Sequence, residues 1–416
     1  MKSRDTFPEN PGSLSILDFK YELPEDRIAI YPLEERDASR LLVYRNGQIN
    51  HSVFKQLPDI LKPGDCLVFN DTKVIHARLY FDKPGGGHVE ILCLEPHVPT
   101  EITASFGSKG SCQWKAMTGN AKSWKIGEVL RKNIGLKNEQ YELHAELLSK
   151  DMDGSVVLFS WHAEKTFSEI LDDAGILPLP PYLKREAESE DEERYQTVYA
   201  RADGSVAAPT AGLHFTRSVF DSLKAKEVQS VFLTLHVGAG TFKPVKSATM
   251  ADHAMHQEKI ELSASTLDQL RTASIENRVI AVGTTSLRTL ESLYWFGVKL
   301  VSGEKIDSFM VEQWEPYTLA RQDVSATESL EAVAAWLGMR NQTMLSGHTR
   351  LLIAPGYNVR MVDALITNFH QPQSTLLLLV SAMIGDDWRR VYDYALENDF
   401  RFLSFGDSSI LFTKRK

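Results

Sequence analysis

The chain has little of what marks several classes of protein. It has only three cysteines, at positions 66, 93 and 112, and no C-x-x-C pair, so neither a disulfide scaffold nor a zinc knuckle is indicated. Its longest apolar stretch, Leu376–Ile384, is far shorter than the roughly 20 residues that a transmembrane helix needs. The opening MKSRDTFPENPG lacks the apolar core of a signal peptide. We therefore expect a cytoplasmic protein with no membrane partner and with reduced cysteines.

An excess of positive charge is also absent. The 416 residues include 46 Lys and Arg against 55 Asp and Glu, for a formal net charge of −9. This balance disfavours a protein that binds nucleic acid through bulk charge, but it leaves room for a local basic surface. Within segment 63–162, basic residues group at Lys122, Lys125, Arg131, Lys132 and Lys137. They predict phosphate contacts, although such clusters are commonly just solvated surface.

The spacing of apolar runs predicts two kinds of structure. From residue 63 to 162, short β-rich runs alternate with Gly, Pro and Asp turns, which predicts a small β-barrel. Beyond that segment strands alternate with helices, which predicts an α/β domain with a mixed sheet. We therefore expect a mixed-sheet α/β main domain, residues 1–62 and 163–416, with a small β-barrel domain, residues 63–162, inserted into it. Segment 295–347 is an extra segment that the pattern does not place.

Individual elements follow from the same patterns. The segment Leu14–Ile30 predicts a short strand and then a helix, and Asn46-Gly47 predicts a hairpin turn. The predicted strands are Val231–Val237, Val279–Val282, Ala364–Thr367 and Phe402–Phe405. The predicted helices are Phe167–Ala174, Arg217–Lys226, Ser265–Ser274, Leu287–Tyr294, Ser329–Leu337 and Leu376–Ile384.

Polar clusters follow three of the predicted strands. Gly283-Thr284-Thr285-Ser286 follows one, Asn368 to Ser374 follows another, and Gly238-Ala239-Gly240-Thr241 follows a third. In an open α/β sheet, ligands bind outside the carboxyl ends of the strands, and helix N-termini attract anions. Each Ser or Thr alone is explained as a helix cap, but several such junctions together favour a ligand site. The third glycine of a dinucleotide fingerprint is missing, because Lys243 stands in its place.

Histidines supply candidate acid–base groups. His214 follows a run of small residues, where backbone can lie close to a ligand, although a lone histidine in an apolar frame is commonly a core residue. His253, His256 and Glu258 share one segment, but their spacing is not H-E-x-x-H. We therefore predict no metal site there. The segment is either a plain polar loop or a hydrogen-bonding wall with one histidine available for proton transfer.

Long motifs in a fixed order cover most of the chain. They include LPEDRIAIYPLEERDASRLLV, LKPGDCLVFNDTKVIHARL, YQTVYARADGSVAAPTAGLHFT, TLHVGAGTFKPV, RVIAVGTTSLRTLES, VDALITNFHQPQSTLLLLVSA and RFLSFGDSSILF. Through them the chain resembles the S-adenosylmethionine:tRNA ribosyltransferase-isomerases of queuosine biosynthesis. The chain departs from the family pattern at His76, where proline is usual, and at Phe405, where tyrosine is usual.

The resemblance implies an α/β body with an inserted β-barrel, and it implies a reaction. The ribosyl moiety of S-adenosylmethionine passes to the 7-aminomethyl group of 7-aminomethyl-7-deazaguanine at the wobble position of tRNA. It is isomerised there to give epoxyqueuosine, and adenine and methionine leave. S-adenosylmethionine is then a co-substrate, tRNA is the partner, and we expect a monomer.

This chemistry needs a base beside the C5′ carbon, whose hydrogens the sulfonium acidifies, and donors for the oxyanions that develop. It needs no metal, because the co-substrate carries the activation itself. We predict His214 and His236 as the leading acid–base residues, with His253, His256 and His370 in reserve. The predicted co-substrate-binding residues are Thr210, Thr241, Thr284, Thr285, Arg288, Asn368, Ser374 and Asp407. Arg288 is expected to pair with the methionine carboxylate, with a surface ion pair as the simpler alternative.

Two other interpretations remain open. One is a metal-dependent nucleoside or nucleotide hydrolase that uses His253, His256, Glu258 and His370. The other is a non-enzymatic RNA-binding adaptor built on the barrel, which would need clustered aromatic and basic residues that are sparse here. Release of adenine from S-adenosylmethionine only in the presence of substrate tRNA separates the three.

Overall fold

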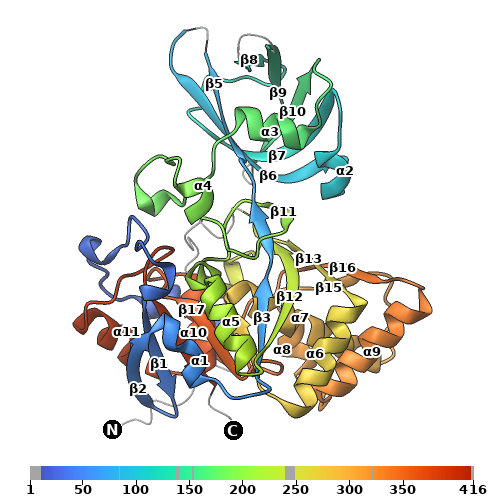
Figure 1. Ribbon diagram of the computed structural model, residues 1–416. Helices are drawn as coiled ribbons and strands as arrows, with labels where there is room; N and C mark the ends of the chain where they lie inside the picture. Colours follow the sequence, from blue (N-terminus) through green and yellow to red (C-terminus); the bar gives the residue numbers. More distant parts are fainter. Residues whose placement is uncertain are drawn as a thin grey trace. The chain divides into compact units, whose positions relative to one another are not determined.

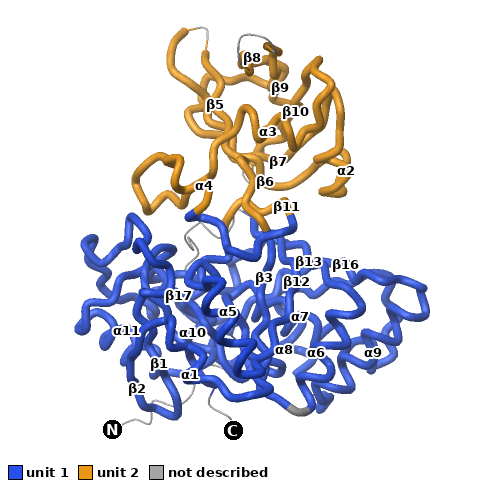
Figure 2. Tube along the Cα trace, viewed as in Figure 1, with its two compact units in different colours: residues 1–72, 194–202, 209–416 blue, residues 73–193, 203–208 orange. Residues whose placement is uncertain are grey.

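The computed structural model describes residues 11–83, 85–135, 140–151, 154–238, 249–320 and 322–413. The chain divides into two compact units (Figure 2). Unit 1 comprises residues 1–72, 194–202 and 209–416, and unit 2 comprises residues 73–193 and 203–208. The division into an α/β domain of residues 1–62 and 163–416 and an inserted barrel domain of residues 63–162 stays a prediction.

Unit 1 is built on a ten-stranded mixed sheet (Figure 1). In spatial order its strands are β15 (Phe309–Val311), β16 (Met344–Thr349), β13 (Glu258–Ser263), β12 (Gln229–His236), β3 (Cys66–Asn70), β14 (Val279–Val282), β17 (Ala364–Asn368), β18 (Ser408–Phe412), β1 (Arg40–Arg45) and β2 (Gln48–Val53). The central strands β12, β3, β14 and β17 are parallel. Antiparallel partners flank them, β13 beside β12 and β18 beside β17. The predicted mixed α/β sheet is therefore confirmed.

The central strands are apolar because helices cover the sheet. Every residue of β3, β14 and β17 is buried, and such continuous apolar runs are typical of parallel strands between helical layers. The α-helices of unit 1 are α1 (Leu57–Ile60), α5 (Arg217–Ala225), α6 (Ala264–Glu276), α7 (Thr284–Val301), α8 (Glu315–Leu319), α9 (Ala326–Met339), α10 (Thr375–Ile384) and α11 (Asp387–Glu397). The central helix α7 extends beyond its predicted range at both ends.

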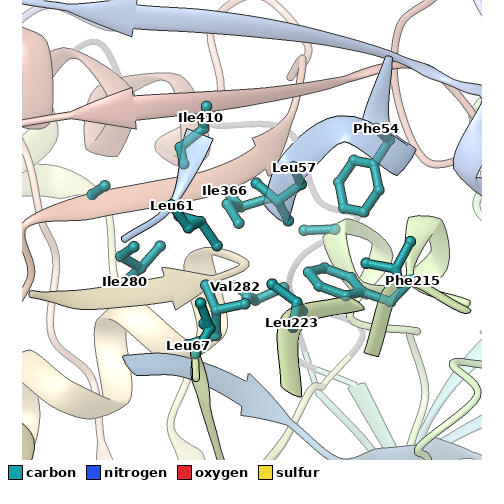
Figure 3. Packing of buried hydrophobic residues seen from close by; sticks show 14 of the residues in the cluster. Phe54, Leu57, Leu61, Leu67, Phe215, Leu223, Ile280, Val282, Ile366 and Ile410 are labelled. Carbon is teal, nitrogen blue, oxygen red and sulfur yellow. The ribbon is translucent and has the colours of Figure 1, made fainter. Parts of the chain in front are cut away.

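One core cluster lies against the sheet (Figure 3). It includes Ala211 of a short 3-10 helix, η7 (Thr210–His214). Phe215, directly after η7, is fully buried. Its ring packs edge-on against Phe54 and Phe69, with the centroids 4.9 Å away in both pairs. This aromatic contact anchors η7, and with it His214, close to the ends of the strands.

Segment 295–347 completes one side of the main sheet. It contributes the end of α7, then β15, α8, α9 and the first part of β16. Helices α7 and α9 meet at Gly297, where an added Cβ would lie 2.2 Å from the carbonyl oxygen of Ser329. Glycine is thus required for this close approach.

Unit 2 contains a six-stranded antiparallel sheet. In spatial order its strands are β5 (Arg78–Asp82), β6 (His88–Val98), β7 (Ser111–Gly119), β10 (Gly154–Trp161), β9 (Tyr141–Asp151) and β8 (Val129–Ile134). The outermost strands, β5 and β8, approach each other, so the sheet is nearly closed and the predicted small barrel is confirmed. The remaining elements are α2 (Ile102–Phe106), α3 (Phe167–Ala174), α4 (Asp191–Arg194), and the paired strands β4 (Thr72–Val74) and β11 (Ala202–Ser205).

Two predicted segments are wrong. Leu14–Ile30 forms short 3-10 turns instead of a strand and a helix, because Ile28 pairs with the distant Phe402. Phe402–Phe405 is not a strand, because Leu403 has a φ of 69° that breaks the extended chain. The strand forms later, at β18. The Asn46-Gly47 hairpin turn is confirmed, with both residues at positive φ between β1 and β2.

No helix in the described ranges is long and apolar enough to cross a membrane. All three cysteines are buried and free, as expected, and burial raises the pKa of the Cys66 thiol to about 12.

We expect Gly297→Ala to lower the free energy of unfolding by about 1–3 kcal/mol, because its methyl group would push α9 away from α7. Gly338→Ala, in α9 with nothing within 4 Å of the added Cβ, is the matched control. It should be neutral or slightly stabilising because alanine favours helix. Urea unfolding of both variants tests this, and equal midpoints for the two would contradict the close packing.

Candidate active site

The central parallel strands end at one edge of the main sheet, and Asn70 joins three elements there. This residue ends β3 and is fully buried. Its amide nitrogen donates to the Leu235 carbonyl at 2.9 Å and to the Thr285 hydroxyl at 3.4 Å, and its oxygen accepts from the Leu235 amide at 2.9 Å. Asn70 thereby ties the end of β12 and the first turn of α7 to β3, at the edge where α/β sheets bind ligands.

A hydrogen-bonded chain of four side chains lies at the end of β17. The Thr210 hydroxyl donates to the Asn368 oxygen at 2.9 Å, and the Asn368 nitrogen lies 3.2 Å from Nε2 of His214. Nδ1 of His214 lies 2.8 Å from the Ser39 hydroxyl. Because an amide nitrogen can only donate, the network assigns Nε2 as the acceptor and places the ring proton on Nδ1. Three predicted residues therefore come together, and Ser39 joins them.

Burial keeps the His214 ring neutral. The residue is 4% exposed, and burial lowers its pKa to about 4. A hydrogen bond with the Arg36 backbone opposes this lowering of the pKa, and the charges of Arg401 and Arg36 add to it. Both arginines, with Arg194, also line a cavity of about 20 Å³ beside the ring, which has room for about one water molecule. At neutral pH His214 is thus an uncharged hydrogen-bonding group.

His236 has a different environment. It ends β12, and its Nε2 lies 3.1 Å from a carboxylate oxygen of Glu261, diagonally opposite on β13. The hydrogen bond from His236 lowers the pKa of Glu261 to about 2, and Lys259 acts in the same direction. The carboxylate is therefore ionised at neutral pH. Nδ1 of His236 is buried and has no hydrogen-bond partner among the residues that the structure describes.

Arg288 is buried rather than on the surface. It lies one turn into α7, is 8% exposed, and donates from Nη1 to Glu258 at 2.5 Å. Thr284 and Thr285, at the start of the same helix, are half-buried. Burial raises the pKa of Glu258 and Arg288 opposes that rise. Arg288 therefore does form an ion pair within the protein, but in the interior and not on the surface.

Three other predicted residues hold the local fold. Nε2 of His370 lies 2.9 Å from the Thr367 hydroxyl, and burial lowers the pKa of His370 to about 3. The Ser374 hydroxyl caps α10, and Asp407 accepts from two backbone amides at 3.0 and 2.8 Å. These contacts explain the three residues structurally, and their roles in binding or catalysis stay predictions.

The remaining candidates are His253, His256 and Thr241. His253 is half-buried, which lowers its pKa, and the neighbouring His256 is exposed. Thr241 lies outside the described residues. In the described part of the chain, no group of three or more His, Cys, Asp or Glu side chains is arranged to hold a metal ion.

Sequence reasoning missed Asn70, Asp71 and Glu261. The first two carried a signal, since two polar residues follow the buried run CLVF directly. Asp71 accepts from the Thr234 hydroxyl at 2.7 Å. Glu261 carried no local signal, because only the register of β12 and β13 brings it to His236.

A cleft lies at the opposite ends of the strands. It has a volume of about 1130 Å³ and is lined by residues that include Lys62, Asp65, Arg278, Arg360 and Asp363. None of the predicted site residues lines it. Volume alone therefore does not locate the polar cluster described above.

Unit 2 carries the predicted basic group. Lys122, Lys125 and Arg131 are exposed, whereas Lys132 is half-buried and donates to the Ala174 carbonyl at 2.9 Å. Lys137 lies outside the described residues. Contact of these side chains with phosphates stays a prediction.

Comparison with known proteins identifies relatives along almost the whole chain. A family model described as queuosine biosynthesis protein matches residues 16–411. The S-adenosylmethionine:tRNA ribosyltransferase-isomerase of Xylella fastidiosa strain M12 is 40% identical over 403 residues, which cover 95% of this chain and 97% of that protein. The protein of the same name from Legionella pneumophila strain Lens is 40% identical over 398 residues, covering 95% and 98%. A crystal structure of S-adenosylmethionine tRNA ribosyltransferase from Thermotoga maritima is 29% identical, with a TM-score of 0.45, and covers 94% of this chain and 99% of that one.

Glu261→Gln should make the protein less stable at neutral pH, by about 1 kcal/mol, because a charge-assisted hydrogen bond is lost. The folded-state pKa of Glu261 is depressed to about 2 from 4.5. Its stabilisation is therefore present above about pH 4.5 and is lost as the pH falls towards 2. Urea unfolding at pH 7, 5 and 3.5 should show the gap between wild type and variant closing. Glu95→Gln, at an exposed pair with Lys115, is the control, and a gap independent of pH would contradict this account.

Proposed function

This chain belongs to the queuosine biosynthesis protein family, and we propose that its catalytic centre is the polar edge formed by the ends of β12, β3, β14 and β17. The chain is an S-adenosylmethionine:tRNA ribosyltransferase-isomerase. It transfers the ribosyl moiety of S-adenosylmethionine to the 7-aminomethyl group of 7-aminomethyl-7-deazaguanine in tRNA and isomerises it to give epoxyqueuosine. Adenine and methionine are released.

The observation that carries this proposal is Nδ1 of His236, which is buried and has no partner within the described ranges. The ionised Glu261 accepts from Nε2–H, so that the tautomer is fixed and the lone pair stays on Nδ1. We assign His236 as the base that takes a proton from C5′ of S-adenosylmethionine. The electron pair of that C–H bond stays on the carbon next to the sulfonium, whose positive charge stabilises it.

His214 is better suited to positioning than to proton transfer. Both of its ring nitrogens are engaged, and its lowered pKa keeps it neutral. Its bond to Asn368 orients that amide, which in turn holds the Thr210 hydroxyl. We propose that Asn368 and Thr210 bind the ribose hydroxyls and the oxyanions that develop as the ring opens.

No residue of this proposed centre requires a metal. S-adenosylmethionine supplies the electrophilic sulfonium itself, and the polar groups described above are hydrogen-bond donors and acceptors. A cytoplasmic location and a monomeric state belong to the same proposal, as does contact of tRNA phosphates with Lys122, Lys125 and Arg131.

His236→Ala should lower the rate of tRNA-dependent adenine release from S-adenosylmethionine by about 10²–10⁴-fold, because the general base is lost. The matched control is His51→Ala, on the exposed edge strand β2, which should keep the wild-type rate. Circular dichroism and urea unfolding should show both variants folded. A rate within threefold of wild type in His236→Ala would remove His236 from the mechanism.

Adenine release should continue at an undiminished rate after dialysis against excess EDTA, because the proposed chemistry uses no metal. The measurement compares initial rates before and after chelation, with and without substrate tRNA. Loss of activity that Mg²⁺ or Zn²⁺ restores would favour the metal-dependent hydrolase instead. Adenine release that does not depend on tRNA would also contradict the proposed reaction.

A further inference from the structure

Arg288 presents two hydrogen-bond donors that the fold does not use. Its Nη1 donates to Glu258, but Nε and Nη2 are buried and have no partner among the residues that the structure describes. These two nitrogens form the side of the guanidinium that binds a carboxylate in a bidentate manner. Arg278 shows that geometry elsewhere in this chain, where Nε and Nη2 both donate to Asp65. We call Nε and Nη2 of Arg288 the fork. Burying these two donors without an acceptor costs free energy, unless a ligand accepts from both of them.

The N-terminus of α7 provides a second, independent feature at the same place. Its N-cap is Gly283, at a φ of 88°, and no side chain caps the helix. Within the described ranges, no acceptor binds the backbone N–H groups of Thr284, Thr285 or Ser286. An 18-residue helix with free N–H groups attracts an anion. Because long helical side chains lean towards the N-terminus, we expect the Arg288 guanidinium to lie towards this end of α7.

The fork lies beside the proposed base. Glu258, which holds Arg288, opens β13, and the next residue, Lys259, is the strand partner of His236. In S-adenosylmethionine, a chain of only three carbons and the sulfur separates the carboxylate from C5′. A carboxylate bound to the fork would therefore keep C5′ in the neighbourhood of His236.

We propose that Nε and Nη2 of Arg288, together with the free N–H groups of α7, bind the α-carboxylate of the methionyl part of S-adenosylmethionine. This inference rests on the proposed function, since it names the subsite for one end of that co-substrate. Glu258 is a positioning residue that holds the guanidinium by Nη1 and moderates its charge.

The test compares S-adenosylmethionine with its decarboxylated analogue, which keeps the sulfonium and lacks the carboxylate. Equilibrium binding of each is measured by calorimetry, for the full chain alone and with unmodified tRNA that lacks the aminomethyl group. Wild type should bind S-adenosylmethionine at least tenfold more tightly than the analogue. Arg288→Lys should reduce this preference to about threefold or less, because an ammonium cannot form the fork. Glu258→Gln should increase the preference, because Arg288 keeps a hydrogen-bond partner but loses its neutralising charge.

Two further variants keep the test decisive. Arg288→Met combined with Glu258→Gln removes both buried charges, so that a fold defect from one unpaired charge is avoided, and it should also lose the preference. Arg278→Lys disrupts a half-buried guanidinium pair of the same bidentate geometry, which lines the large cleft, and it should leave the preference unchanged.

A preference that survives in both Arg288 variants would overturn the carboxylate assignment. A wild type without preference would overturn it as well, and so would a preference lost only in Arg278→Lys, which would place the carboxylate in the large cleft. Weaker tRNA binding with a flatter salt dependence in Arg288→Lys, at an unchanged preference, would assign the fork to an RNA phosphate instead. Failure of wild type to bind S-adenosylmethionine under either condition would contradict the proposed function itself, together with this subsite.

Discussion

The polar edge of unit 1 depends on the burial of its central strands. β3, β14 and β17 contain only buried positions, because helices cover both faces of the sheet, so a side chain that needs water or a ligand has no place along their length. Asn70 and Asn368 are the last residues of their strands, and Thr284 is the second residue after the end of β14. Since these strands are parallel, their ends meet at one edge. The same burial that stabilises the sheet therefore concentrates the hydrogen-bonding groups.

Burial and hydrogen-bond partners give the histidines different roles, although the sequence alone does not distinguish them. His214 and His370 are buried with hydrogen-bonded rings, and desolvation lowers the pKa of both, so they are neutral and hold neighbouring side chains in place. His236 is held at one nitrogen by an ionised carboxylate, and its other nitrogen has no hydrogen-bond partner in the described part of the chain. A base needs an available lone pair, and this difference in partners, rather than residue type, is the reason for assigning proton transfer to His236.

Prediction from the sequence worked where periodicity is strong. Strand Val279–Val282 was placed at its observed bounds, and helix α10 differs from its prediction by one residue, because long apolar runs between polar junctions allow few alternatives. It failed where tertiary contacts override local pattern. Phe402–Phe405 is apolar enough for a strand, yet the Phe402 ring packs with Phe369 and Tyr392 while Leu403 turns the chain. The edge formed by segment 295–347 was not predictable either, because β15 is only three residues long and gains its stability from pairing with β16.

The sequence by itself determined the class of fold, the family and the junctions at which polar side chains follow buried strands, since all of these are properties of consecutive residues. Only the tertiary structure decided which of those side chains meet. The register of β12 against β13 brings Glu261 to His236, and the packing of η7 under Phe215 brings His214 to Asn368. It also decided that Arg288 is buried with two donors that no described residue accepts from. Such features depend on distances and burial between residues far apart in the chain, and no local pattern of residues encodes them.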